Sequence, residues 1–350
     1  MKLLFVGEGW KGSSARSMRE GLAEISGLDQ DDIVEDLYMP RGRSPLIRAC
    51  NRIMKPVYIG ELGREILLRL RSAEADVLVV YKGNLVAPGI IRAARARGII
   101  TVNIFPDFSP HRYGPALREA MGEYDLVIST KPFHPGNWKS VYGYANECVF
   151  VPHGYDELVH FWGSPVGTHT IDVAMAASWR PEYERLLIEL ADRLRDKSIS
   201  ISIAGNAWER SRNKLPKSWE FHGGLYGRAY GSFLRRAKIV IAPVNREVFI
   251  DGRQQPGDED TTRTYELAAA WCFFLHRRTP YVKSIFDEEL EVPMWSDASE
   301  LAELIDHFLP RSEERARKAA AAHRRAVPNY STKARAMAAY QYILELTQRK

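Results

Sequence analysis

Short apolar runs alternate with longer amphipathic segments through the first half of the chain. The apolar runs are rich in β-branched or aromatic residues and end in Gly, Pro or polar turn residues, a pattern typical of buried strands. They cover residues 2–7, 76–81, 99–105, 125–130 and 148–152. The segments between them predict helices at about 13–26, 44–73, 88–97 and 113–122. Because strands and helices alternate, the pattern predicts a parallel sheet that helices cover on both faces.

The second half repeats this plan. Strands are predicted at 172–178, 199–205, 219–223, 238–244 and 272–277. Helices are predicted near 181–195, 227–236, 261–271, 298–309 and 312–326, and a last helix at about 331–347 follows a break at Pro328–Asn329. Residues 153–169 are rich in Gly, Pro and His, as expected of a linker.

We therefore predict an α/β protein of two doubly wound, Rossmann-like domains facing a cleft. The first domain covers residues 1–152 and the second covers 170–328, with the linker between them. A chain of 350 residues is long enough to give each domain a full core.

The composition of the chain indicates the cellular compartment in which we expect the protein. The start, "MKLLFVGEGW", has only four apolar residues in a row, too few for a signal peptide or a membrane span. Three cysteines, Cys50, Cys148 and Cys272, lie far apart without a CxxC spacing. We expect them to be buried free thiols in a reducing compartment, and hence a cytoplasmic protein without a structural zinc site.

The net charge is +5, and much of the excess is local. Residues 41–60 hold five basic side chains and no acidic one. Such a cluster suits phosphate ligands, an anionic membrane surface or nucleic acid, and a solvated face explains it equally well. Peripheral contact with the inner face of a membrane through residues 41–60 is thus an open alternative. We expect no nucleic-acid partner, because the chain lacks an evident aromatic and basic recognition element.

Ligands of doubly wound sheets bind beyond the carboxyl ends of the strands, so the residues there deserve most weight. In "GEGWKGSS" (7–14), Gly9 belongs to a Gly-rich turn that could bring backbone close to a phosphate, although tight packing explains the turn as well. After the strand at 99–105 come Asp107 and His111, which we take as catalytic candidates on the acceptor side.

Arg180 follows the strand at 172–178 directly, where a guanidinium could bind a diphosphate. The alternative is an ion pair at the start of the helix with Glu182 or Glu184. The sequence alone does not decide between them.

The stretch "TTRTYELAAAWCFFL" (261–275) begins a helix near Thr261 or Thr262 and carries Arg263 and Glu266. Glu266 could interact with the helix dipole or pair with Arg263 at i, i+3. A capping box would need Ser or Thr at position 263, which it lacks. We favour a third interpretation, in which the helix opens on the ligand and the Glu266 carboxylate accepts hydrogen bonds from a ribose diol.

Acidic residues precede this helix in the motif Asp258-Glu259-Asp260. Asp258 stands eight positions before Glu266, a spacing at which the two acids would bracket a sugar nucleotide. The Asp-x-Asp form also matches a motif that holds a divalent ion on a diphosphate in another transferase fold. We favour an exposed acidic loop over a metal site.

With these residues in place, the second half resembles GT-B glycosyltransferases of the large retaining "glycosyl transferases group 1" type, and most closely the spore-maturation CgeB-like branch. The stretches that carry the resemblance are "VPHGYDELVHFWGSP", "WEFHGGLYGRAYGSFLRRAKIVIAPVNRE", "TRTYELAAAWCFFLHRRTP" and "AAHRRAVPNYSTKARAMAAY". It covers about residues 150–345 and implies that the final helix, 331–350, crosses back onto the first domain.

The resemblance implies a role for individual residues. Glu266 matches the Glu that binds the donor ribose, and Arg180 matches the Arg that binds the donor phosphates. Asp258 stands where many members have the first Glu of a Glu-x7-Glu pair. The remaining donor-side candidates are the nucleobase loop Gly223, Gly224 and Leu225, with Thr262, Arg263 and Gly9. Where the family usually has Gly, this sequence has Trp271 and Cys272, which we expect to narrow the pocket.

The implied activity is transfer of a sugar from a nucleoside diphosphate sugar, UDP- or GDP-linked, to a glycan, lipid-linked or other small acceptor. Retention of configuration and independence of metal follow as family expectations, and no other cofactor is expected. The alternative is a non-catalytic module that binds a nucleotide sugar or phosphate at a membrane.

Overall fold

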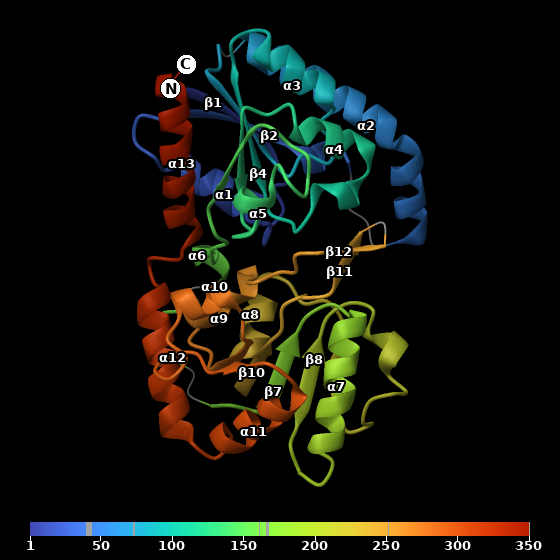
Figure 1. Ribbon diagram of the computed structural model, residues 1–350, viewed down its shortest axis with the longest axis vertical. Helices are drawn as coiled ribbons and strands as arrows, with labels where there is room; N and C mark the ends of the chain where they lie inside the picture. Colours follow the sequence, from blue (N-terminus) through green and yellow to red (C-terminus); the bar gives the residue numbers. More distant parts are fainter. Residues whose placement is uncertain (40–43, 73, 161, 166–167, 251, 350) are drawn as a thin grey trace. The chain divides into compact units, whose positions relative to one another are not determined.

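The computed structural model describes residues 1–39, 44–72, 74–160, 162–165, 168–250 and 252–349. The chain divides into two compact units (Figure 1). Met1–Pro152 and the segment from Thr332 onward form the first, and His153–Ser331 forms the second.

The first unit is built on six parallel strands in the order β2-β1-β3-β4-β5-β6. They are β1 (Lys2–Gly7), β2 (Asp29–Val34), β3 (Val77–Tyr81), β4 (Ile100–Phe105), β5 (Leu126–Ser129) and β6 (Glu147–Phe150). Alternate residues of β1 join different cores, Leu4 on one face of the sheet and Leu3 on the other. Because both faces are covered, the central strands β3, β4 and β5 are buried along their whole length and are mostly apolar.

Helices supply the two covers of this sheet. One core includes residues of α2 (Pro45–Ser72), α3 (Pro88–Arg95) and α4 (Pro115–Met121). The other includes residues of α1 (Ser14–Ala23) and α13 (Thr332–Arg349). The short segments η1 (Glu35–Leu37), η2 (Pro110–Tyr113) and α5 (His134–Asn137) follow strand ends.

The C-terminal helix α13 packs along α1, which confirms that the end of the chain returns to the first unit (Figure 1). The two helices approach closely at Gly21. A Cβ at this position would lie 2.9 Å from the Ala336 Cβ and 3.3 Å from the Lys333 Cα. A glycine here therefore sets the distance between the helices.

The second unit has six parallel strands in the order β14-β13-β10-β7-β8-β9. They are β7 (Ile171–Ala176), β8 (Ile201–Ala204), β9 (Glu220–His222), β10 (Ala237–Ala242), β13 (Phe274–Arg277) and β14 (Met294–Trp295). Counted within the unit, this is the order 3-2-1-4-5-6 of dinucleotide-binding folds. The switch point of the topology lies between β7 and β10.

The helices of the second unit again cover both faces of its sheet. The core on one face includes residues of α7 (Pro181–Arg193) and α11 (Ala298–Phe308). The core on the other includes residues of α8 (Gly227–Arg235), α9 (Thr262–Ala269) and α10 (Pro280–Ile285). The helix α12 (Ser312–Ala326) contributes to both. The remaining elements are α6 (Glu157–His160), η3 (Trp208–Ser211) and the hairpin of β11 (Val248–Ile250) and β12 (Arg253–Gln255).

This architecture confirms the predicted fold class of two parallel, doubly wound α/β units. The sequence missed β2, whose "DQDDIV" is mostly polar because an edge strand leaves much of its surface in water. The expected burial of all cysteines is wrong for Cys50, which is exposed on α2. No helix among the described residues has the length and apolarity to cross a membrane.

The close contact at Gly21 gives a stability prediction. Gly21→Ala should lower the unfolding free energy of the first unit by about 1–3 kcal/mol, because the new methyl group overpacks the α1–α13 contact. Gly60→Ala is the matched control, since nothing lies within 4 Å of its Cβ position in α2. Removing a helical glycine there should stabilise the unit by about 0.5–1 kcal/mol. Urea unfolding of both variants measures the difference, and equal effects would contradict the packing.

Candidate functional site

A pocket of about 160 Å³ opens at the carboxyl ends of β7 and β8, beside the switch point of the second sheet. Three short backbone stretches and two side chains surround it. Its lining residues are Ala176, Ala177, Ser178, Ala204, Gly205, Asn206, Gly224, Leu225, Tyr226, Tyr230 and Arg263. Of the predicted donor residues, it thus brings together Gly224, Leu225 and Arg263, whereas Gly223 does not line it.

Backbone sterics hold the loops of this pocket together. Gly205 has a φ of +151°, and a Cβ there would lie 2.0 Å from the Ala177 carbonyl oxygen. A Cβ at Gly224 would lie 2.7 Å from Asn206 Oδ1. No larger residue fits at Gly205 without moving backbone, so the end of β8 can approach the end of β7 only with glycine at this position.

The amino end of α9 is fixed by a chain of buried hydrogen bonds. The Thr261 amide donates to the Thr264 hydroxyl at 3.1 Å, and that hydroxyl lies 2.9 Å from His276 Nε2. His276 Nδ1 donates to the Arg277 carbonyl at 2.7 Å. A carbonyl only accepts, so Nδ1 carries a proton. Because burial lowers the pKa of His276 to about 4, the imidazole is neutral at pH 7 and Nε2 accepts the Thr264 proton. The sequence excluded a capping box that uses Glu266. Thr264 makes part of such a capping box instead, because its hydroxyl accepts the Thr261 amide.

Arg263 extends from the first turn of α9 to the pocket. Its guanidinium donates to the Pro243 carbonyl at 2.9 Å, just beyond β10. Its Nε is buried and has no hydrogen-bond partner among the described residues. The predicted i, i+3 pair is therefore not formed, because no ion pair joins Arg263 to Glu266 in the described part of the chain. A half-buried guanidinium with an unused buried donor at a pocket wall is suited to an anionic ligand.

Glu266 lies behind the pocket and does not line it. Its carboxylate accepts a hydrogen bond from the Tyr230 hydroxyl at 2.9 Å and lies 3.7 Å from His160 Nε2. Tyr230 lines the pocket, so it stands between the cavity and the carboxylate. The sequence missed both Tyr230 and His160, since His160 comes from a helix in the predicted linker.

Arg180 occupies the cap position of α7 and has an extended backbone. It forms no ion pair with any residue that the structure describes. The two acids proposed as its partners are engaged elsewhere. Glu182 accepts the Arg246 and Glu247 amides at 2.9 and 3.2 Å, and Glu184 pairs with Lys214 at 2.8 Å. The predicted salt bridge at the helix start is therefore wrong, and Arg180 stays a candidate for binding phosphate.

The motif Asp258-Glu259-Asp260 is not the exposed loop that we expected. Asp258 and Asp260 are buried, and the Asp260 carboxylate accepts a hydrogen bond from the Tyr265 hydroxyl at 2.6 Å. Glu259 instead accepts the Tyr281 amide at 2.9 Å. Among the described residues, no group of three or more His, Cys, Asp or Glu side chains is arranged to hold a metal ion.

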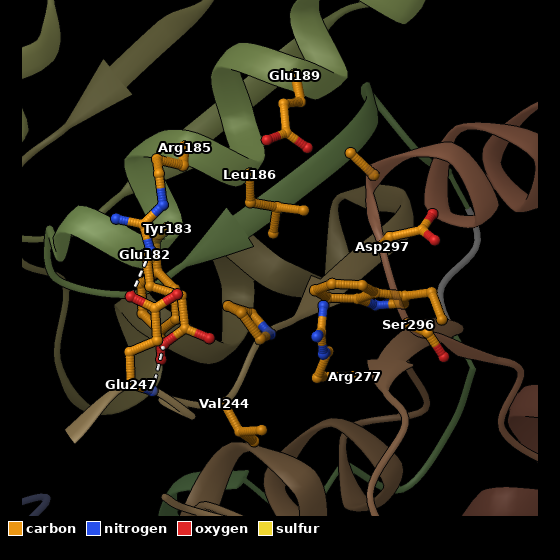
Figure 2. A pocket seen from close by; sticks show the side chains of 13 residues that line it. Glu182, Tyr183, Arg185, Leu186, Glu189, Val244, Glu247, Arg277, Ser296 and Asp297 are labelled. Atoms are coloured by element: carbon orange, nitrogen blue, oxygen red, sulfur yellow. Dashed lines mark hydrogen bonds and ion pairs between the residues drawn. The ribbon is translucent and has the colours of Figure 1, made fainter. Parts of the chain in front are cut away.

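A second pocket of about 200 Å³ lies beyond the ends of β10, β13 and β14 and shares no residue with the first. Figure 2 shows Glu182, Arg185 and Glu247 on one side and Arg277 on the other. Arg185 pairs with Glu247, and the Arg277 guanidinium lies 5.0 Å from the centre of the Trp295 ring. Side chains of both charges line this pocket, so its charge selects no ligand.

In the first unit, the Gly-rich turn is occupied by a carboxylate of the protein itself. The amides of Gly9 and Trp10 donate to Asp36 Oδ2 at 2.6 and 3.1 Å. A Cβ at Gly9 would lie 2.6 Å from Val34 Cγ1. The structure therefore favours the packing interpretation of the turn over a phosphate contact at Gly9.

Asp107 follows β4 and belongs to a buried polar cluster. Its carboxylate lies 2.8 Å from Lys82 Nζ and accepts a hydrogen bond from the Tyr113 hydroxyl at 2.7 Å. Burial acts to raise the pKa of Asp107, but the Lys82 ammonium outweighs burial and holds it below its usual value. Lys82 has a φ of +64°, an uncommon conformation for a residue other than glycine. His111 packs edge-on against Tyr142 and Tyr144.

Trp271 takes the position where the resembling family usually has glycine, and its φ is +59°. This left-handed conformation explains why glycine suits the end of the helix. Here the indole stacks on His323 at 3.8 Å and donates to the Trp162 carbonyl at 2.8 Å. Trp271 and Cys272 do not line the pocket of about 160 Å³, so the expected narrowing is wrong.

Two Rossmann-like units with a C-terminal helix that returns to the first define the class of GT-B proteins, and solved structures share this fold. A sucrose-phosphate synthase from Thermosynechococcus elongatus is 11% identical, with a TM-score of 0.71 and 100% of both chains covered. Anabaena HepE in complex with UDP-glucose is 11% identical, with a TM-score of 0.66, 99% of this chain and 100% of that chain covered. A glycosyltransferase from Rickettsia africae is also 11% identical, with a TM-score of 0.63 and coverage of 99% and 98%.

At the level of sequence, a family model described as glycosyl transferase-like matches residues 180–341. The match begins at Arg180 and includes α9, and it supports a glycosyltransferase. The chain has no match among curated protein sequences. None of these comparisons separates branches of the family, so the CgeB-like assignment stays a prediction.

The neutral state of His276 makes the amino end of α9 sensitive to acid. Burial lowers the pKa of His276 to about 4, whereas an unfolded histidine titrates near 6.5. As the pH falls below 6.5, His276 becomes protonated in the unfolded chain but stays neutral in the folded chain. The stabilisation present above pH 6.5 is therefore lost towards pH 4, by about 3 kcal/mol.

Urea unfolding of the wild type and of His276→Gln between pH 7 and pH 4 measures this effect. We expect the stability difference between the two proteins to shrink as the pH falls. A constant difference would show that the imidazole is not held neutral in the folded protein.

Proposed function

We propose that the protein transfers a sugar from a nucleoside diphosphate sugar and binds this donor at the carboxyl edge of the second sheet. The observation that carries the proposal is the pocket at the switch point, with the guanidinium of Arg263 in its wall. The match of the glycosyl transferase-like family over residues 180–341 supports the same conclusion.

The base would occupy the pocket beside Gly224 and Leu225, where backbone groups border the cavity. The diphosphate would lie towards Arg263 and the amino ends of α7 and α9. Helix amino ends and guanidinium groups stabilise a departing diphosphate, and they do so without a metal ion. Arg180 and Thr262, at the starts of these two helices, are the further contacts that we propose for the phosphates.

The ribose would reach Glu266 only when Tyr230 moves, because the Tyr230 hydroxyl holds the carboxylate at 2.9 Å. A carboxylate can accept hydrogen bonds from both hydroxyls of a ribose. Exchange of one tyrosine bond for two ribose bonds would therefore couple donor binding to a rotation of Tyr230.

The acceptor would be a glycan, a lipid-linked sugar or another small molecule, with its contacts in the first unit. Asp107 and His111 are the catalytic candidates there, and Asp258 is the third in the second unit. The ion pair of Asp107 with Lys82 keeps Asp107 charged, which suits electrostatic stabilisation better than proton donation. A retaining, hexosyl-type reaction is part of the proposal.

A panel of nucleotides tests the donor assignment. UDP, GDP, ADP, TDP and CDP would each be added to the protein with and without magnesium or manganese. A ligand that binds only the folded state raises the melting temperature. We expect one metal-independent shift, with UDP favoured because HepE was solved in complex with UDP-glucose.

The release of nucleotide from the corresponding sugar donor is the second measurement of this test. A shift without transfer or hydrolysis would instead indicate a non-catalytic binding module. A shift that requires metal would contradict the metal-independent mechanism. No shift at millimolar ligand would contradict the donor site itself.

The ribose assignment can be tested with a cycle of ligands and variants. Glu266→Gln should weaken binding of the preferred nucleoside diphosphate about tenfold to a hundredfold, the range for hydrogen bonds to a charged group. The 2′,3′-dideoxy analogue should bind the wild type weakly by a similar factor. Because the analogue lacks both hydroxyls, Glu266→Gln should bind the analogue almost as tightly as the wild type does.

Isothermal titration of the four combinations gives the coupling between Glu266 and the diol. If the losses in binding free energy from the variant and from the analogue are additive, Glu266 does not contact the ribose. Glu259→Gln is the matched control, since this carboxylate caps α10 through the Tyr281 amide. It should leave the affinity of both ligands unchanged.

A further inference from the structure

The first half of α2 exposes an apolar face that the unit leaves uncovered. Among the described side chains from 46 to 61, none is buried. The large apolar side chains among them have the following exposed fractions: Leu46 77%, Ile47 41%, Ile53 77%, Met54 40% and Val57 45%. Cys50 is also exposed. A contiguous apolar surface of this kind marks a site of interaction.

The periodicity of these residues makes them one face of the helix. Leu46, Cys50, Ile53 and Val57 recur at i, i+4, i+7 and i+11, which places them in a single stripe. Ile47 and Met54 border the stripe on one side. The first half of α2 is therefore amphipathic in its own right.

The second half of α2 is amphipathic in the opposite sense. Its buried residues are Leu62, Ile66 and Leu70, which join the core on one face of the first sheet. At 3.6 residues per turn, this buried stripe lies about half a turn from the exposed one. Pro56 lies inside α2, so the two stripes need not share one straight axis, but no residue of the exposed stripe belongs to a core that the structure describes. The exposed stripe is therefore available to a different partner.

Charge identifies that partner. Arg52 and Lys55 are exposed and lie on the side of the helix away from the apolar stripe. Residues 41–60 hold five basic side chains and no acidic one, and Arg41 and Arg43 lie outside the described residues. An apolar face backed by cations is the pattern of a helix that lies at the surface of an anionic bilayer. The basic cluster alone fits a solvated face equally well, and the apolar stripe decides between the two.

We propose that the first half of α2 binds the surface of anionic membranes, with Leu46, Ile53 and Val57 among the acyl chains and Arg52 and Lys55 at the headgroups. This surface belongs to the first unit, whereas the donor pocket belongs to the second. The proposal therefore goes beyond the proposed function and does not depend on it.

Binding to vesicles tests the proposal with the full chain. The protein would be sedimented with vesicles of phosphatidylcholine and phosphatidylglycerol, and with vesicles of phosphatidylcholine alone. We expect binding to the anionic vesicles that weakens as salt is added, since each basic residue near the surface contributes about fivefold. Arg52→Gln/Lys55→Gln removes two such charges and should therefore bind about 25-fold more weakly.

The apolar stripe has its own variant and control. Leu46→Asp/Ile53→Asp should weaken binding by at least about tenfold, because two large side chains can no longer enter the bilayer. Val141→Asp/Leu290→Asp makes the same kind of change at positions that are 41% and 67% exposed and lie outside α2, and should bind like the wild type. Thermal melting and the nucleotide shift should be unchanged in both variants.

A fluorophore reports which side of the helix enters the lipid. Cys50 lies in the stripe, so an environment-sensitive dye on Cys50 in a Cys148→Ser background should shift to the blue with anionic vesicles. The dye on Leu290→Cys, with Cys50→Ser and Cys148→Ser, should not shift, because Leu290 is exposed outside α2.

Three results would overturn the proposal. They are no binding to anionic vesicles, equal binding by Leu46→Asp/Ile53→Asp and the wild type, and self-association without lipid that this variant abolishes. The last would assign the face to a second copy of the chain. A lost nucleotide shift with intact vesicle binding would instead count only against the donor site.

Discussion

The architecture depends on one constraint, that a parallel sheet must bury both of its faces. Connections between parallel strands pass over the faces as helices, so the central strands have no exposed side on which to place polar chemistry. The chemistry of both units therefore lies at the carboxyl ends of the strands. Arg180 follows β7, Arg263 begins the helix after β10, and Asp107 follows β4.

Local devices in the second unit shape one such edge into a pocket. Gly205 lets the ends of β7 and β8 approach, and the chain from Thr261 through Thr264 to the neutral His276 fixes the start of α9. The same strand edge then presents Arg263 with an unused buried donor. These features hold the groups around the pocket in place before an anion binds.

Only part of helix α2 serves to cover the sheet. Only its second half covers the sheet, through Leu62, Ile66 and Leu70. The first half extends beyond the core, and its apolar residues lie on the opposite side of the helix. Stability of the unit does not account for Leu46, Ile53 and Val57, because none of them contributes to a core. Their presence is explained by contact with something outside the unit.

The sequence by itself determined the fold. The apolar runs that form the strands at 2–7, 76–81 and 238–244 are local properties of the chain, so they can be recognised without knowing which residues they contact. It also indicated Arg263 and the loop at Gly224 as parts of the pocket. Only the tertiary structure could show that Asp36 fills the Gly9 turn, that Tyr230 covers Glu266 and that Asp258 and Asp260 are buried. Each of these features depends on contacts between residues that are distant in the sequence. Local sequence patterns do not predict such contacts.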